Sequence, residues 1–82
     1  MSATHDIAFS RRILTDVHRD VKRHWPEVNL RKDASVHHFH GEQWEFHGPG
    51  RFYDGTIKAT NAYQARANGW IAYMNAKGVE VY

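Results

Sequence analysis

The chain has 82 residues, a net charge of +2, a sequence pI near 9.2 and no cysteine. This length fits one domain, which buries only about 60–65% of the surface of its unfolded chain and has little room for a deep substrate cavity. Disulfides, thiolate nucleophiles and cysteine-ligated zinc are excluded. Because no apolar stretch is long enough to cross a bilayer and residues 1–12 do not resemble a signal peptide, we expect a cytoplasmic protein without a membrane partner.

Residues 5–24 have the periodicity of an amphipathic helix. Thr4 is the expected N-cap, and Pro26 predicts an end near His24, since the residue before a proline disfavours helix. The apolar arc of this helix contains Ile7, Ile13, Leu14, Val17 and Val21. A separate basic arc contains Arg11, Arg12, His18, Arg19, Lys22 and Arg23.

The basic arc is a candidate surface for the phosphates of a nucleic acid. Residues 1–34 hold seven Lys/Arg against five Asp/Glu, whereas residues 35–82 hold four of each, so the positive surplus lies in the first part. Asp16 and Asp20 border the arc and could neutralise it in part, which is the alternative of an ordinary solvated helix surface.

A polar connection at 27–34 leads to two short runs that flank Gly41-Glu42 as a β-hairpin. Glycine at the first central position indicates a type II′ turn. The resulting register pairs His40 with Gln43, Phe39 with Trp44, His38 with Glu45, and His37 with Phe46. Strand alternation then predicts one face with Phe39, Trp44, Phe46 and His37. The solvated face carries Val36, His38, His40, Gln43, Glu45 and His47.

The rest of the chain predicts a turn at 48–50, a third strand with a bulge or turn at Asp54-Gly55, and a second helix from Ala62 to about Ala76. Asn61 and Gln64 resemble a capping box, and Gly78 fits the C′ position. The order α-β-β-β-α, with a short strand at 79–82 as an option, predicts a two-layer α+β domain in which one sheet face carries both helices.

The second helix is apolar on two sides. A stripe of small residues, including Gly69, suits close packing on the sheet. A different arc carries Tyr63, Trp70 and Met74. This arc is either covered by the first helix or partly exposed as an interface with a protein partner or a second copy.

Four histidines in residues 35–50 suggest two further chemistries. His38, His40, Glu45 and His47 share a predicted face and are the types of ligand that zinc accepts. The stretch HFHGEQWE resembles the first metal motif of the cupins, but the chain is too short for the cupin barrel. An ordinary solvated hairpin face is the alternative, and we expect no metal and no cofactor.

The segment SVHHF at 35–39 resembles the Ser-His-His stretch of the HicA-type mRNA interferase toxins, which share the helix–three strands–helix order. The resemblance implies RNA cleavage with His37 or His38 as the catalytic group and Glu45 nearby, although Val36 interrupts the motif. Double-stranded RNA-binding domains also share this order, without a matching basic cluster in the second helix. Small phage-borne inhibitors of host machinery have a similar size and composition.

The sequence therefore predicts a small non-enzymatic binding module that contacts a protein partner or itself through its helix faces. Nucleic-acid binding through the basic arc and a ribonuclease that uses the hairpin histidines are the two alternatives.

Overall fold

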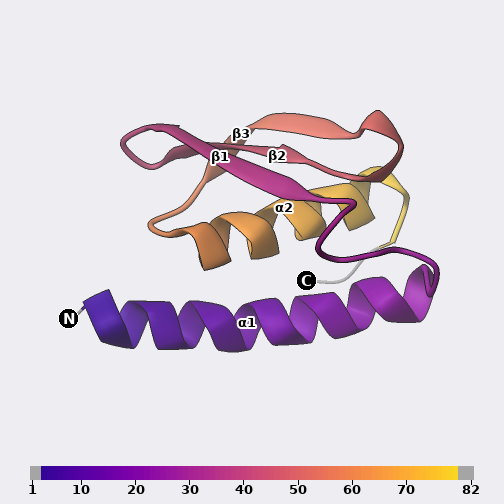
Figure 1. Cartoon of the computed structure of the whole chain (residues 1–82), viewed down its shortest axis with the longest axis horizontal. Coiled ribbons are helices and arrows are strands. Elements are labelled where there is room, and N and C mark those ends of the chain that lie inside the picture. The colour runs from indigo at the N-terminus through magenta and orange to yellow at the C-terminus, as the bar shows by residue number, and fades with distance from the viewer. Residues whose placement is uncertain (1–2, 80–82) are drawn as a thin grey trace.

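The computed structural model describes residues 3–79, with side chains from residue 7 onward (Figure 1). The elements are α1 (Ala3–His24), β1 (Ser35–His40), β2 (Gln43–His47), the 3₁₀ turn η1 (Pro49–Arg51), β3 (Tyr53–Lys58) and α2 (Ala62–Ala76). The strands form one antiparallel sheet in the order β1-β2-β3. The predicted α+β class and the order α-β-β-β-α are confirmed.

The helices are arranged differently from the expectation that both lie on the sheet. Figure 1 shows the sheet, α2 and α1 stacked in that order, and α1 packs mainly on α2. α2 therefore has a neighbour on two sides, which explains why two of its arcs are apolar. The core contains Leu14, Val17, Val21, Phe46, Ile57, Trp70, Tyr73 and Met74.

Gly69, in the predicted small-residue stripe of α2, lies directly against the sheet. A Cβ at Gly69 would overlap the ring of Phe46, so only glycine lets the helix and β2 approach this closely. The caps are also confirmed. Asn61 accepts a hydrogen bond from the Gln64 amide at 2.9 Å, and Gly78 has a φ of 84° at the C′ position.

The predicted hairpin register is wrong for most of β1. His40 pairs with Gln43 as expected, but a bulge follows, and His38 pairs with Trp44 and Val36 with Phe46. Phe39 is the extra residue, because a bulge places two residues of one strand opposite one of the other. Its side chain is 54% exposed instead of buried.

This shift moves the β1 side chains between the two faces of the sheet. Val36 packs against the core, and the His38 ring stacks on Trp44 with centroids 4.6 Å apart. His37 lies on the outer face, next to His47. The inward positions of Trp44 and Phe46 and the outward positions of Glu45 and His47 agree with the prediction.

β3 carries its own irregularity between the partners of Trp44 and Phe46, as the Asp54-Gly55 pair predicted. The Asp54 carboxylate accepts hydrogen bonds from the Thr56 amide at 2.8 Å and the Thr56 hydroxyl at 2.6 Å. The predicted turn at 48–50 is present as part of η1. Of the optional strand at 79–82, Val79 is not in a strand, and 80–82 lie outside the described residues.

α1 begins at Ala3, so Thr4 lies within the helix and not at its N-cap. The helix ends at His24, as Pro26 predicted. Its first turns extend past the start of α2 (Figure 1), because Ser10 is the residue that meets Asn61. Ile7 is consequently 37% exposed and Phe9 60% exposed. Neither described helix has the length and apolar character needed to cross a membrane.

Candidate binding surface at the helix seam

The arc of Tyr63, Trp70 and Met74 does not form the exposed interface that we considered. Trp70 and Met74 are fully buried, because α2 lies between α1 and the sheet. The Trp70 ring meets the Phe46 ring of β2 edge-on at 5.3 Å. Tyr63, nearer the start of α2, is only partly buried. The sheet covers Trp70 through Phe46, and α1 meets this arc at Tyr63 through Arg11.

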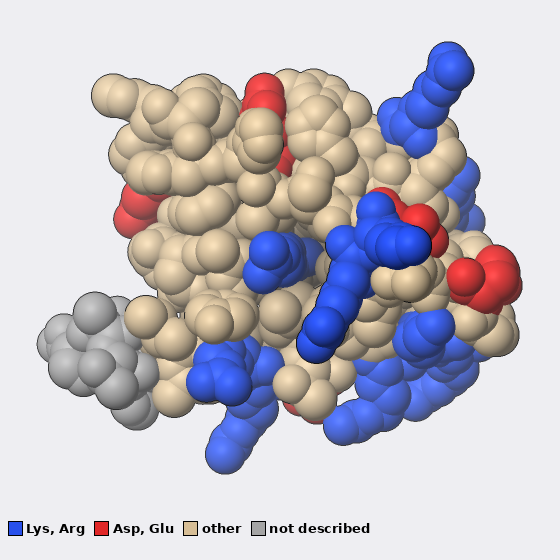
Figure 2. Space-filling model, viewed as in Figure 1, with Lys and Arg blue, Asp and Glu red and all other residues tan. Residues whose placement is uncertain are grey.

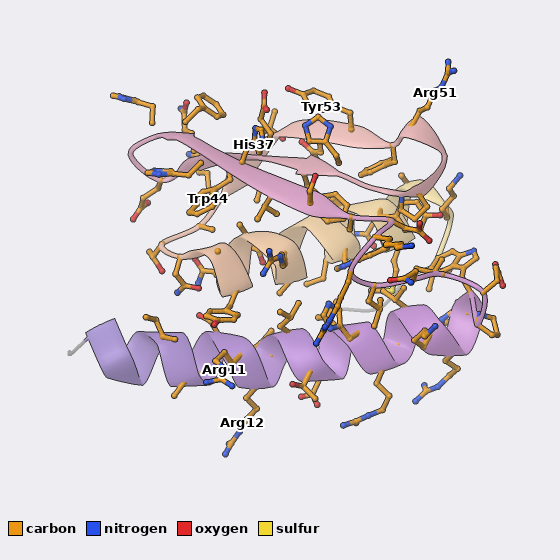
Figure 3. All side chains as sticks on the ribbon, in the orientation of Figure 1. Arg11, Arg12, His37, Trp44, Arg51 and Tyr53 are labelled. Atoms are coloured by element: carbon orange, nitrogen blue, oxygen red, sulfur yellow. The ribbon has the colours of Figure 1, made fainter. Side chains whose placement is uncertain are left out.

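The predicted basic arc of α1 separates into three groups with different surroundings. On the outer side, Arg19 lies 3.4 Å from Asp16 and Arg23 lies 3.6 Å from Asp20, in exposed i,i+3 pairs. Arg12 is also exposed on α1 (Figure 3) and has no ion-pair partner among the described residues. The three arginines Arg12, Arg19 and Arg23 are called the outer arginines below.

Lys22 forms a second group by itself. Its ammonium group donates to the backbone oxygens of Pro26 and Val28, in the connection that follows α1. This lysine therefore helps to hold the connection against the helix, and part of its hydrogen-bonding capacity is used within the chain.

Arg11 and His18 turn toward α2 and form the third group. The Arg11 guanidinium lies over the Tyr63 ring at 5.6 Å from its centroid. Seven residues later on the same side of α1, His18 feels the positive charge of Arg66 in α2. We call the surface formed by Arg11, His18, Arg31, Tyr63 and Arg66 the helix seam.

A hollow of about 400 Å³ opens in the helix seam. Its polar lining residues are His18, Arg31 and Arg66, and the rest of its wall consists of Leu14, Leu30 and Ala34. None of the described carboxylates lines it. Arg31 and Arg66 are exposed, and neither guanidinium has an ion-pair partner among the described residues. The hollow therefore combines an apolar wall with uncompensated positive charge.

His18 is the least satisfied group of this wall. Its Nε2 atom is buried and has no hydrogen-bond partner among the described residues. Burial, followed by the charge of Arg66, lowers the pKa of the imidazole below its ordinary value. An unpaired buried nitrogen is unfavourable, so this position of His18 lowers the stability of the folded chain.

The segment that carries Arg31 is held by a local hydrogen-bond network. The Asn29 side-chain oxygen accepts from the amides of Arg31 and Lys32, both at 3.0 Å. The Asp33 carboxylate accepts from the Asn29 amide at 2.8 Å. The core also anchors this connection, because Val28 is buried and the Trp25 ring meets Tyr73 edge-on at 5.1 Å. The backbone that carries Arg31 is thus fixed beside α1 and α2.

The sequence analysis did not identify Arg31 or Arg66. Arg31 lies in a segment without periodicity, and Arg66 lies on a helix whose other residues are mostly apolar. The one available signal was the three-residue spacing of Tyr63 and Arg66, which places both on the same side of α2.

Positive charge is concentrated on the α1 side of the molecule. Figure 2 shows Lys and Arg side chains over α1 and around the seam between the layers, whereas few charged side chains lie over the sheet in this view. The surplus predicted for residues 1–34 thus becomes a local feature of the surface, to which α2 contributes Arg66.

The hairpin histidines form a separate cluster on the outer face of the sheet. Tyr53 donates a hydrogen bond to Glu45 at 2.8 Å, and this bond raises the pKa of the phenol. The His47 Nε2 and Glu45 Oε1 atoms are 3.7 Å apart, and the centroids of the His37 and His47 rings lie 6.0 Å apart. Imidazole and carboxylate groups at such distances can exchange protons with a ligand.

The predicted metal set does not come together. His38 lies on the Trp44 side of the sheet, and its Nε2 contacts the Gly41 oxygen at 2.6 Å, whereas Glu45 and His47 lie on the other side. Within the part of the chain that the structure describes, no group of three or more suitable side chains could hold a metal ion. The bulge separates the ligands that the predicted register had aligned.

The outer cluster and the helix seam lie at opposite ends of the stack. Figure 3 shows His37 and Tyr53 above the sheet, and Arg11 and Arg12 on α1 below it. Arg51 projects away from the cluster at the corner between β2 and β3. A strand bound along the seam would therefore not lie on the histidines.

Comparison of the chain with protein-family models, with curated proteins and with solved structures found no match.

Proposed function

We propose that this protein is a non-enzymatic nucleic-acid-binding module whose contact surface is the helix seam. The observation that carries the proposal is the convergence of Arg31 and Arg66 around one hollow, with Arg11 over the Tyr63 ring on the same side of α1. Each of these side chains comes from a different part of the chain, and none has an acidic partner among the described residues. Guanidinium groups without a carboxylate are free to bind phosphate, often through two parallel hydrogen bonds.

Burial of Trp70 and Met74 also favours the nucleic-acid hypothesis over the protein interface predicted at those residues. The seam keeps one aromatic ring, that of Tyr63, partly accessible beneath Arg11. An aromatic ring beside cationic side chains is a common way to hold bases and backbone of a single strand.

The test compares two variants that lose the same charge. The seam variant replaces Arg11, Arg31 and Arg66 by glutamine. The outer variant replaces Arg12, Arg19 and Arg23 by glutamine. Fluorescence anisotropy with labelled single- and double-stranded RNA and DNA, at low and moderate salt, gives the affinities. We expect the seam variant to lose at least about tenfold and the outer variant less than about threefold.

Equal losses in the two variants would show that overall charge, and not the seam, attracts the nucleic acid. Absence of binding by the unaltered protein at low salt would refute the proposal. Circular dichroism of both variants controls for folding, since all six positions are exposed in the structure.

A second candidate function is self-association through the exposed start of α1. Phe9 and Ile13, one turn apart on the same side of α1, form an exposed apolar patch there. A hollow of about 110 Å³ opens here, and its wall includes Ile13, Ala67 and one side of the exposed Phe9 ring. A projecting ring next to a hollow is self-complementary, which suits a two-fold contact with a second copy.

Sedimentation equilibrium tests this candidate. Phe9→Ser should shift the protein toward monomer, whereas Phe39→Ser, at a ring that is 54% exposed on the hairpin, should not. If the protein without substitutions stays monomeric at high concentration, self-association is contradicted.

The ribonuclease hypothesis remains a prediction, now centred on His37, Glu45 and His47 because the bulge turns His38 away from them. Time-dependent RNA cleavage that is lost in His37→Ala or His47→Ala, and kept in His38→Ala, would support it. Intact RNA after prolonged incubation would contradict it.

A further inference from the structure

We propose that the hollow in the helix seam is a pocket for a phosphate monoester attached to a flat apolar group, the chemistry of a nucleoside monophosphate. Two sources share this chemistry, a free nucleotide and the 5′-phosphorylated end of a strand. If the ligand is a strand end, the pocket rests on the proposed function and deepens it. If the ligand is a free nucleotide, the pocket stands without it.

The charge of the pocket supports a phosphate. Arg31 and Arg66 stand at its rim without ion-pair partners among the described residues, and no carboxylate lines it. A phosphate monoester carries nearly two negative charges near neutral pH, so it matches two guanidinium groups better than a single carboxylate does. His18 also lines this pocket, together with the two arginines and the apolar wall.

The apolar wall supports an attached ring. Leu14 of α1 and Leu30 and Ala34 of the connection form this wall. Inorganic phosphate alone would leave these side chains exposed to water. A volume of about 400 Å³ lies toward the lower end of the usual range for small-molecule sites. The pocket therefore suits one nucleotide and not a longer segment.

The pocket is also built from three fixed elements. α1 supplies His18, α2 supplies Arg66, and the connection supplies Arg31 from a backbone held by Asn29. The edge-on contact of the partly buried Trp25 ring with Tyr73 holds the start of the connection against α2. Little ordering is then needed when a ligand binds, which favours affinity.

Isothermal titration calorimetry with adenosine 5′-monophosphate, inorganic phosphate and benzoate tests the pocket. We expect the nucleotide to bind at least about tenfold more tightly than either of the other two, since only the nucleotide offers both the dianion and the ring. Arg66→Gln and Arg31→Gln should each weaken it by about tenfold or more. Arg51→Gln removes one positive charge at the corner between β2 and β3, away from the pocket (Figure 3). This variant should change the affinity for the nucleotide by less than about twofold.

Equal weakening by Arg66→Gln and Arg51→Gln, or no saturable binding of the nucleotide, would overturn the pocket. If benzoate binds as tightly as the nucleotide, the phosphate assignment is overturned. If inorganic phosphate binds as tightly as the nucleotide, the role of the apolar wall is overturned.

A second arm distinguishes the two sources. Anisotropy compares one RNA sequence with a 5′-phosphate and with a 5′-hydroxyl. Tighter binding of the phosphorylated strand, abolished by Arg66→Gln, identifies a strand end. Nucleotide binding without any RNA binding keeps the pocket as a free-nucleotide site and refutes the proposed function. RNA binding that depends on the seam, without nucleotide binding or a 5′-phosphate preference, keeps the proposed function and refutes the pocket.

Discussion

Single residues fix how closely the layers of this molecule approach one another. Gly69 lets α2 lie directly on the Phe46 ring, and the Phe46 ring meets Trp70 on the same helix. On the other side of α2, His18 accepts a partly buried position that leaves its Nε2 unpaired. The first residue serves packing alone, whereas the second lies in the wall of the only pocket to which we assign a ligand.

We expect Gly69→Ala to lower the free energy of unfolding by up to about 2 kcal/mol. Alanine gains about 1 kcal/mol of helix propensity, but its Cβ overlaps the Phe46 ring, and overpacking typically costs about 1–3 kcal/mol. Urea unfolding measures the change. Asn75→Ala, at an exposed position of the same helix, is the control and should be neutral or slightly stabilising. A Gly69→Ala protein at least as stable as the original would contradict the close approach.

Acid should destabilise the fold through His18. Its pKa is lowered in the folded state, so the unfolded chain binds a proton more readily just below the ordinary histidine pKa. The neutral imidazole contributes fully to the free energy of unfolding above the ordinary histidine pKa. This contribution is lost as the pH falls from the ordinary pKa to the lowered one. His18→Gln should therefore reduce the loss of unfolding free energy between about pH 7.5 and about pH 5.5.

His40→Gln, at an exposed hairpin position, serves as the comparison for this titration. An acid sensitivity that is the same in the His18→Gln protein and the original would be the contradictory result.

The elements were predictable to the extent that local patterns set them. The end of α1 followed from Pro26, and both ends of α2 followed from Asn61 and Gly78. The β1 register did not follow, because a bulge at Phe39 leaves no mark in the alternation of residue types. The helix seam was only half predictable. Arg11 and His18 showed helical spacing, but packing alone brings Arg31 and Arg66 beside them.

The start of α2 should depend on Asn61 in two separable ways. Its side-chain oxygen caps the helix, and its amide nitrogen donates to Ser10 of α1 at 3.1 Å. Asn61→Ala removes both bonds and should lower the unfolding free energy by about 1–2 kcal/mol. Asn61→Asp keeps the cap but loses the donor, so thermal unfolding should place it between Asn61→Ala and the original. An Asn61→Asp protein as stable as the original would mean that the Ser10 contact contributes nothing, and equal stability of the two variants would mean that the cap contributes nothing.

The whole molecule separates its chemistry along the stack. The sheet presents a cluster of His, Glu and Tyr side chains on its outer face, whereas the helices present most of the positive charge (Figure 2). The net charge is only +2, so long-range attraction of a nucleic acid is weak and a few local contacts must supply most of the affinity. The ion pairs of Arg19 and Arg23 reduce the number of available cations further.

The salt dependence of binding should therefore be shallow. If Arg11, Arg31 and Arg66 make the phosphate contacts, log Kobs should fall with log salt with a slope of about −2 for a single strand and about −3 for a duplex. Arg66→Gln should make this slope shallower by the amount that corresponds to about one phosphate contact, because one fewer counterion is released. Anisotropy titrations over a series of salt concentrations measure the slope, with Arg51→Gln as a variant that should leave it unchanged. A slope twice as steep would show that the contact surface extends well beyond the helix seam, and the outer arginines would then be the first residues to include.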